Sequence, residues 1–178
     1  MLAMTDYAGL RSLAGLIHRF EPALDGAVLT ILAAEQRQEI TRLLLDGLAD
    51  VTPRPDVKVE ASSGEYASHI AVLRIGNRKY TFAKDYRETF ISEIGEYSCR
   101  ITPDANGVLV YHIDYPGVVR DVSRILAEYM INISKLNVSR EQKGKNALLV
   151  SLTDEAIPPD VIAKIDQLPN VTKVISLR

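Results

Sequence analysis

Cysteine is nearly absent from this chain of 178 residues, which contains only Cys99. A single cysteine excludes an internal disulfide and any zinc site or cluster that one chain builds from cysteines alone. Histidine is also scarce, since His18, His69 and His112 are the only three, and no two of them stand at metal-ligand spacing. The sequence therefore predicts no metal site, and we interpret Cys99 as an ordinary strand residue.

Long hydrophobic runs and a strong charge of one sign are missing as well. The longest apolar run, at 26–34, is far shorter than the roughly 20 residues that span a bilayer. The first residues lack the charged start, apolar middle and small-residue cleavage site of a signal peptide. A net charge of −2 and a pI of 5.9 give no bulk attraction to nucleic acid or to an anionic membrane. We expect a soluble, cytoplasmic protein with neither as a partner.

Motifs for nucleotide chemistry are not found either. No Gly-x-Gly-x-x-Gly follows a strand, and no Gly-x-x-x-x-Gly-Lys-Ser/Thr occurs anywhere in the chain. Together with the scattered histidines, these absences predict a non-catalytic protein without catalytic residues or a cofactor. The hydrophobic fraction of 47% is enough for one large domain or two small ones.

The first part of the chain, 1–104, predicts a small α+β domain. Apolar residues at helical spacing predict helices at 5–20 and 35–48, and a continuous apolar run predicts a buried strand at 27–33. A strand at 57–61 and two hairpins follow, at 69–82 and 89–101, with the two-residue turns Gly76-Asn77 and Gly95-Glu96. The turn-rich segment 103–106 is the predicted boundary to a second domain at 105–178.

The second part, 105–178, predicts the element order βαββαβ. Strands are expected at 107–113, 131–140, 147–152 and 171–177, and helices at 116–130 and 158–168. This order is the ferredoxin-like split motif, in which four antiparallel strands carry two helices on one face. The apolar alternation slips between Ile133 and Leu136, which indicates a bulge.

The turn Asp114-Tyr-Pro-Gly117 joins the first of these strands to its helix. Pro116 suits the first helical position, and Asp114 suits a helix cap. The free N–H groups and the positive dipole end of a helix start favour a carboxylate or phosphate, and Gly117 has no side chain to keep a small anion away. His112 is expected on the same strand face as Asp114. For both side chains a purely structural role is the alternative.

The turn, the helix and Ile131-Asn132-Ile133 resemble the Asp-x-Pro-Gly, helix, Asn-Ile pattern of ACT domains, which are small amino-acid-sensing modules. The likeness extends to the regulatory end of D-3-phosphoglycerate dehydrogenase, where L-serine is the feedback ligand, and to the β part of iron–sulfur L-serine dehydratase. The resemblance implies a homodimer in which the asparagine reaches the ligand across the subunit interface. The ligand-binding residues that it implies are His112, Asp114, Pro116, Gly117, Val118, Val119, Asn132 and Ile133.

Two positions depart from this pattern. Tyr115 stands where ACT domains of this kind often have arginine, so the ligand carboxylate would depend more on backbone N–H groups after Pro116. The hairpin at 91–101 resembles the intervening domain that precedes the ACT domain in longer phosphoglycerate dehydrogenases. Its turn, Gly95 then Glu96, differs from the usual aspartate or asparagine followed by glycine.

The resemblance leaves three functions open. The first is a non-catalytic amino-acid sensor, free-standing or a regulatory subunit of a separate enzyme, with L-serine as the first choice of ligand. The second is a β-type subunit required for iron–sulfur L-serine dehydratase activity. That family carries a Ser-Ser-Ser-His-Thr stretch near its start, whereas this chain has only Ser62-Ser63-Gly64. The third is an oligomerisation module whose pocket binds nothing.

Overall fold

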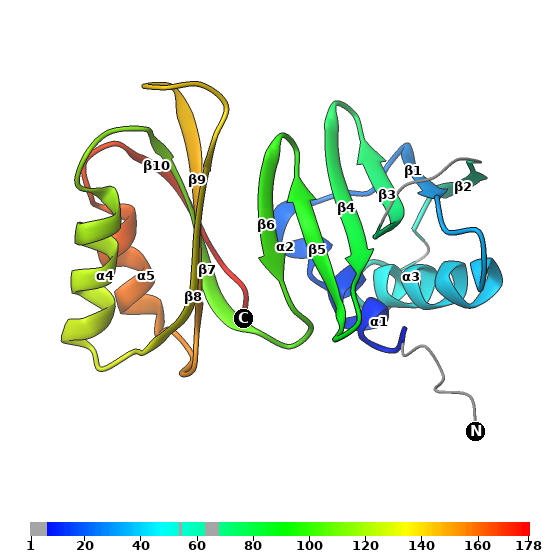
Figure 1. Ribbon diagram of the computed structural model, residues 1–178, viewed down its shortest axis with the longest axis horizontal. Coiled ribbons are helices and arrows are strands. Elements are labelled where there is room, and N and C mark those ends of the chain that lie inside the picture. The colour runs from blue at the N-terminus through cyan, green and yellow to red at the C-terminus, as the bar shows by residue number, and fades with distance from the viewer. Residues whose placement is uncertain (1–6, 54, 63–67) are drawn as a thin grey trace. The chain divides into compact units, whose positions relative to one another are not determined.

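The computed structural model describes residues 7–53, 55–62 and 68–178. The chain divides into two compact units, of which one contains the residues up to Gly95 and Arg100–Asp104, and the other Glu96–Cys99 and Ala105–Arg178. The elements of both are drawn in Figure 1. The predicted helix start at Thr5, and Ser63 and Gly64 of the serine-containing stretch, lie outside the described residues.

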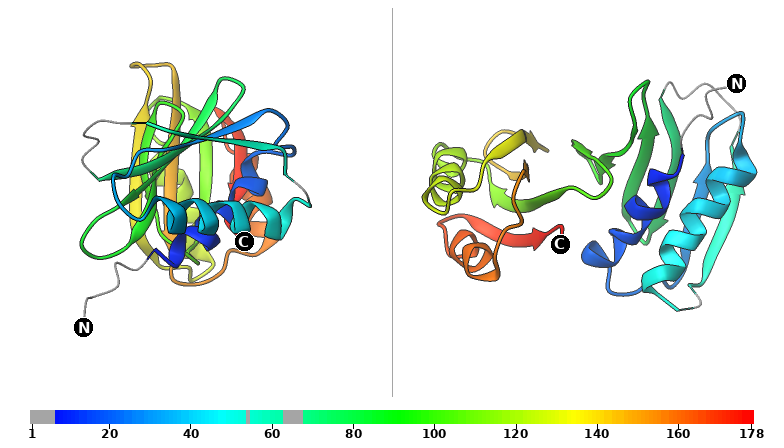
Figure 2. Two further views of the ribbon diagram at one scale, coloured as in Figure 1. Left: turned by 90° about the vertical axis from the view of Figure 1, so that its right-hand side faces the viewer. Right: turned by 90° about the horizontal axis from the view of Figure 1, so that it is seen from below.

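The first unit contains most of a six-stranded sheet in the order β2-β1-β3-β4-β5-β6, and the residues of its last strand, β6, are divided between the two units. Helices α1, α2 and α3 lie along one face of this sheet (Figure 2). The helices are α1 Gly9–Gly15, α2 Ile17–Phe20 and α3 Arg37–Val51. The strands are β1 Ala27–Ile31, β2 Val57–Ala61, β3 His69–Ile75, β4 Arg78–Lys84, β5 Thr89–Ile94 and β6 Tyr97–Ile101.

One pair of strands in this sheet is parallel. β1 runs parallel to β2, with Ala27 opposite Val57 and Ile31 opposite Ala61, and antiparallel to β3. A parallel pair requires a crossover connection, and α3 supplies it. The carboxyl ends of β1 and β2 therefore lie next to each other, near the first turn of α3.

Burial in the first unit alternates along β1, whereas β3, β4 and β5 contain runs of consecutive buried residues and β2 is mostly exposed. Leu29 of β1, Leu73 of β3 and Ile91 of β5 have no exposed surface. Leu29 is paired with Leu73 in the sheet, so both side chains point to the same face. α1 and α3 each bury a stripe of apolar side chains. The stripe of α1 includes Leu10 and Leu13, and that of α3 includes Ile40, Leu44 and Leu48.

The predicted helices of this unit were partly wrong in extent. The single helix expected at 5–20 is two short helices that are interrupted at Leu16. α3 begins at Arg37 and ends at Val51, two to three residues later than predicted. The two hairpins are present, and Gly76 and Gly95 have φ angles of 62° and 60°. Those left-handed angles explain glycine at the first turn position.

The second unit is a four-stranded antiparallel sheet in the order β10-β7-β9-β8. Figure 1 shows α4 and α5 together on one face of it. This arrangement confirms the predicted ferredoxin-like βαββαβ fold. The elements are β7 Asn106–Ile113, α4 Val118–Glu128, β8 Ile133–Arg140, β9 Asn146–Thr153, α5 Pro159–Asp166 and β10 Val171–Ser176.

The core of this second unit lies between the sheet and its two helices. The strands contribute Val108, Val110 and Leu149, and the helices contribute Val118, Val122, Ile125, Leu126, Val161 and Ile165. The predicted irregularity in β8 is confirmed, because the pairing of β8 with β9 shifts register between Ile133 and Lys135.

Candidate functional site

The N-terminus of α4 lies directly beyond the end of β7. Gly117 is the N-cap residue, with φ 111° and ψ −17°, and no side chain caps the helix. Pro116 therefore precedes the cap, and the prediction that it is the first helical residue was wrong. The first intrahelical bond runs from the Asp121 N–H to the Gly117 carbonyl at 2.9 Å. The N–H groups of the three residues between, which begin with Val118 and Val119, have no intrahelical acceptor.

Asp114 is not the cap of α4, and that prediction was also wrong. Its carboxylate is held by the β8–β9 hairpin instead. Oδ2 accepts a hydrogen bond from Arg140 Nη1 at 2.9 Å and one from the Gly144 N–H at 3.1 Å. The Asp114 N–H donates to the Lys145 carbonyl at 2.7 Å. The hairpin thus fixes both the backbone and the side chain of Asp114.

These contacts keep Asp114 charged. The Gly144 N–H, followed by Arg140, lowers the pKa of the Asp114 carboxyl below its ordinary value. Both bonds go to Oδ2, so Oδ1 has no hydrogen bond from another described residue. Asp114 is therefore an oriented carboxylate with one oxygen available to a cationic group.

His112 lies on β7 with only 3% of its surface exposed. Its Nδ1 lies 3.0 Å from the Ile113 carbonyl oxygen, which requires the ring proton to be on Nδ1. In a neutral imidazole, Nε2 is then an acceptor. Nε2 is buried and has no partner among the described residues. β7 ends at Ile113, so the alternation that was expected to place His112 and Asp114 on one strand face stops before Asp114.

Asn132 and Ile133 lie at the opposite end of α4. The helix has 11 residues, and a rise of about 1.5 Å per residue separates its ends by roughly 16 Å. Asn132 Nδ2 donates to Asp154 Oδ2 at 2.7 Å, and its N–H donates to Glu155 Oε1 at 3.0 Å. Within one chain the structure therefore brings His112, Asp114 and the start of α4 together, but not Asn132.

Two arginines near the turn were missed by the sequence analysis. Arg140 reaches Asp114 from the end of β8. Arg120 folds back over the helix start, because a Cβ on Gly117 would lie 3.4 Å from Arg120 Nη2. Arg120 Nε also donates to Asp121 Oδ1 at 3.0 Å. Arg120 is the third residue of α4, so its position in the first helical turn could have indicated from the sequence that it lies near the turn at 114–117. The contact of Arg140 with Asp114 depends on strand pairing, which the sequence does not show.

Residues 7–53, 55–62 and 68–178 contain no group of three histidine, cysteine, aspartate or glutamate side chains that could hold a metal ion. No helix in these ranges is long and apolar enough to cross a membrane.

The family comparison agrees with the fold of the second unit. The ACT domain family model matches residues 108–170, from β7 to the residue before β10. The C-terminal unit contains an ACT domain. ACT domains are regulatory, amino-acid-binding modules that often dimerise.

Several curated proteins resemble parts of this chain. A D-3-phosphoglycerate dehydrogenase of Methanocaldococcus jannaschii is 32% identical over 84 residues, which cover 47% of this chain and 16% of that protein. The Bacillus subtilis D-3-phosphoglycerate dehydrogenase is 28% identical over 121 residues, 66% of this chain and 23% of that protein.

A third relative carries a different name. The probable L-serine dehydratase beta chain of Bacillus subtilis is 28% identical over 87 residues, 49% of this chain and 40% of that protein. The chain therefore matches less than half the length of each of these three relatives. Their names connect the ACT domain of this chain with proteins of serine metabolism.

Proposed function

We propose that this protein is a non-catalytic sensor of a small amino acid, with L-serine as the first ligand to test, and that it acts as a regulatory protein or subunit through an ACT-domain dimer. The ligand would lie at the start of α4. The observation that carries the proposal is the buried Nε2 of His112, which accepts no hydrogen bond from the part of the chain that the structure describes.

The groups around that nitrogen complement an amino-acid zwitterion. An ammonium group needs acceptors, which Asp114 Oδ1 and His112 Nε2 provide. A carboxylate needs donors, which the first N–H groups of α4, at Val118 and Val119, provide together with the helix dipole. Gly117 and Pro116 shape the approach to these groups. L-serine also carries a hydroxyl group, which can donate one further hydrogen bond to these acceptors. The relatives named for serine metabolism support L-serine as the first ligand to test.

The proposed dimer interface is the β8 edge of the ACT sheet. Val138 is paired with Leu149 and Leu136 with Ser151, so both side chains lie on the helix-bearing face of the sheet. They are nevertheless 45% and 38% exposed. An uncovered strand edge with exposed apolar side chains favours pairing with a second copy.

Two-fold pairing through β8 would complete the site. β8 begins next to Asn132 and ends at Arg140, beside Asp114. In an antiparallel pair of two β8 strands, the beginning of one strand lies beside the end of the other. Asn132 and Ile133 of the partner subunit would then approach Asp114, although about 16 Å separates the two ends of α4 within one chain.

Mixed dimers test this arrangement directly. His112→Ala and Asn132→Ala proteins are prepared separately, unfolded together in urea, refolded and titrated with L-serine by calorimetry. If the two residues act across the interface, each mixed dimer contains one intact site and one doubly altered site. Each pure variant contains none. We expect the mixture to regain about a quarter of the wild-type stoichiometry, because half of the dimers are mixed and each has one of two sites.

The control uses a double variant. When His112→Ala/Asn132→Ala protein is refolded with wild-type protein, a quarter of the dimers are wild-type homodimers with two intact sites, and the mixed dimers contain no complete site. This control should therefore retain about a quarter of the wild-type stoichiometry, whereas a site built within one chain would retain about a half. Thermal stability provides a second readout, since ligand at about 100 times its Kd should add roughly 2.7 kcal/mol to wild-type stability. The proposal is overturned if no small amino acid binds the wild-type protein, or if both single variants bind L-serine as well as wild type.

A β-type subunit of L-serine dehydratase is the second candidate. It is favoured by the Bacillus subtilis beta chain, of which this chain matches 40%. This function predicts that a cluster-bearing partner gains L-serine dehydratase activity when the protein is added. A sensor without that role would bind L-serine but leave the activity of such a partner unchanged.

A further inference from the structure

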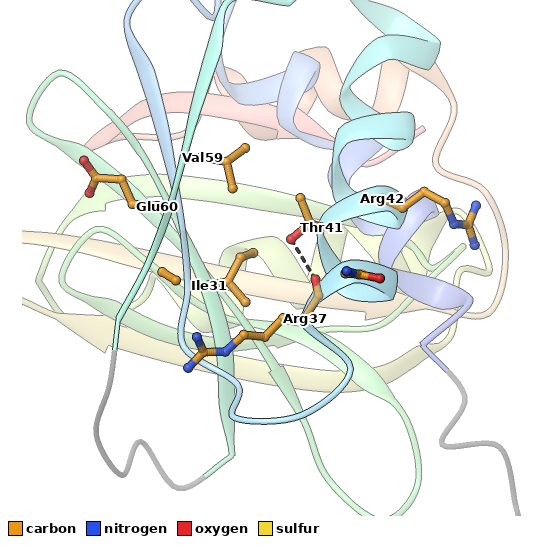
Figure 3. A pocket seen from close by; sticks show the side chains of 8 residues that line it. Ile31, Arg37, Thr41, Arg42, Val59 and Glu60 are labelled. Atoms are coloured by element: carbon orange, nitrogen blue, oxygen red, sulfur yellow. Dashed lines mark hydrogen bonds between the residues drawn. The ribbon is translucent and has the colours of Figure 1, made fainter.

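A pocket of about 450 Å³ opens in the first unit, away from the ACT domain. It lies where the carboxyl ends of the parallel strands β1 and β2 meet the first turns of α3 (Figure 3). Ligands of α/β proteins bind in this position, outside the carboxyl ends of parallel strands. The volume is also within the roughly 300–1,000 Å³ of small-molecule sites.

The walls of this pocket are mainly apolar. Ile31 is the last residue of β1, and Val59 and Ala61 belong to β2. Val59 is 42% exposed, although it is a large apolar side chain. Thr41 adds a methyl group, because its hydroxyl donates to the Arg37 carbonyl at 2.7 Å, as drawn in Figure 3. A short branched hydrocarbon group therefore fits these walls.

Arg37 supplies the charge at this pocket. Its Nε donates to the Ala33 carbonyl at 2.7 Å and its Nη2 to the Ser62 carbonyl at 3.2 Å. These two bonds fix a half-buried guanidinium between the loops that follow β1 and β2. No carboxylate of the described residues lies within ion-pair distance of it, and its remaining N–H groups are unused. A fixed, partly desolvated cation of this kind favours an anionic partner.

The other charged groups at the pocket are already paired. Arg42 donates to Glu39 Oε1 at 2.8 Å and to Asp46 Oδ2 at 3.3 Å. Glu60 forms an ion pair with Lys58 at 3.2 Å. A second, polar hollow beside the pocket is also lined by Arg37. The unpaired charge of Arg37 thus lies between an apolar space and a polar one.

We propose that this pocket binds a small organic monocarboxylate with a short branched apolar body. The carboxylate pairs with the free N–H groups of Arg37, and the apolar body covers Ile31, Val59 and Ala61. The site is independent of the amino-acid site proposed for the ACT domain, since the two are built from different units of the chain.

The test compares 3-methylbutanoate with its neutral isostere 3-methylbutanamide, on the full chain, by amide chemical-shift titration in NMR. Both probes have the same apolar body, so their difference reports the carboxylate. We expect saturable shifts at Arg37, Gln38 and Ala61 with the acid, and about tenfold weaker binding of the amide, because hydrogen bonds between two charged groups are stronger than those to a neutral group.

Two variants test whether the guanidinium of Arg37, rather than that of Arg42, binds the carboxylate. Arg37→Gln should reduce the preference for the acid to about twofold or less, whereas Arg42→Gln should retain it, because Arg42 is paired with Glu39 and Asp46. The wild-type comparison stands even if Arg37→Gln is poorly folded. Equal binding of acid and amide by the wild-type protein, no saturable shift with either, or equal losses in both variants would overturn the proposal.

Discussion

Some polar side chains of this protein have hydrogen-bond partners within the fold, whereas others are buried without a partner among the described residues. Asp85 is an example of the first kind, in the turn between β4 and β5. Its Oδ1 accepts hydrogen bonds from the Arg87 and Glu88 N–H groups at 2.8 and 3.0 Å, and its Oδ2 lies 2.9 Å from Arg100 Nη2. Mainly through the two N–H groups, these contacts lower the pKa of Asp85 to about 2.

This lowered pKa predicts a pH dependence of stability. The folded-state pKa lies below the ordinary value of about 3.9, so the charged carboxylate stabilises the folded protein above pH 4. That contribution is lost as the pH falls from about 4 to about 2. We expect Asp85→Asn to lower the melting temperature at pH 7 and to converge with wild type near pH 2. A difference that stays constant with pH would contradict this origin.

Buried hydroxyl groups allow a matched comparison. Thr81 is 1% exposed and its Oγ1 has no partner among the described residues, whereas Thr153 is 6% exposed and its Oγ1 donates to the Glu155 carbonyl at 2.7 Å. Thr81→Val should therefore raise the free energy of unfolding by up to about 1 kcal/mol, and Thr153→Val should lower it by about 1 kcal/mol. Urea denaturation measures both, and changes of the same sign would refute the argument.

At the scale of elements, the first unit depends on the close packing of α1 against α3. Gly47 of α3 lies at this contact, since a Cβ there would lie 2.2 Å from the Arg11 carbonyl oxygen and 2.7 Å from Ala14 Cβ. Gly15, at the end of α1, has only the Gly47 carbonyl at 3.8 Å near its Cβ position. Of these two glycines, the packing of α1 against α3 requires Gly47 but not Gly15.

Gly47→Ala and Gly15→Ala are expected to change stability in opposite directions. Alanine at Gly47 must push the helices apart, and overpacking of this kind costs about 1–3 kcal/mol. Alanine at Gly15 fits without a clash and gains roughly 0.5–1 kcal/mol of helix propensity. Urea unfolding measures both variants, and a Gly47→Ala protein as stable as wild type would show that the helices are not in close contact.

At the scale of the whole molecule, the proposed function depends on an interface that one chain cannot form by itself. The ACT sheet has two edge strands, β8 and β10. β8 exposes Leu136 and Val138, whereas the outward residues of β10 include the charged Lys173. The edge that exposes apolar surface is the one we expect to be covered.

Val138→Lys should therefore produce a monomer. The lysine places a like charge from each subunit at the proposed interface and removes apolar contact. Sedimentation velocity at micromolar protein should give a dimer for wild type and for Lys173→Glu, the control on β10, but a monomer for Val138→Lys. L-serine should also fail to raise the melting temperature of the monomer. A Val138→Lys dimer that still binds L-serine would exclude the β8 interface.

The sequence by itself determined much of the ACT domain. Local rules were sufficient there, because alternation, helical spacing and a Pro-Gly turn act over a few residues each. They predicted the order βαββαβ, the irregularity after Ile133 and a turn at 114–117 between a strand and a helix. They did not predict that Gly117, rather than Asp114, is the N-cap of α4. The Asp114 carboxylate binds Arg140 and the Gly144 N–H instead of the helix N–H groups, and these partners are far away in the sequence.

The tertiary structure decided everything that depends on residues far apart in the chain. Arg140 and Gly144 bind the Asp114 carboxylate away from the helix end, and Glu21 is buried where Arg78 and Tyr80 donate to it. The parallel pairing of β1 with β2 places Arg37 at a pocket that no motif indicates. A sequence pattern encodes local conformation, whereas such contacts arise only when strands pair and faces are buried.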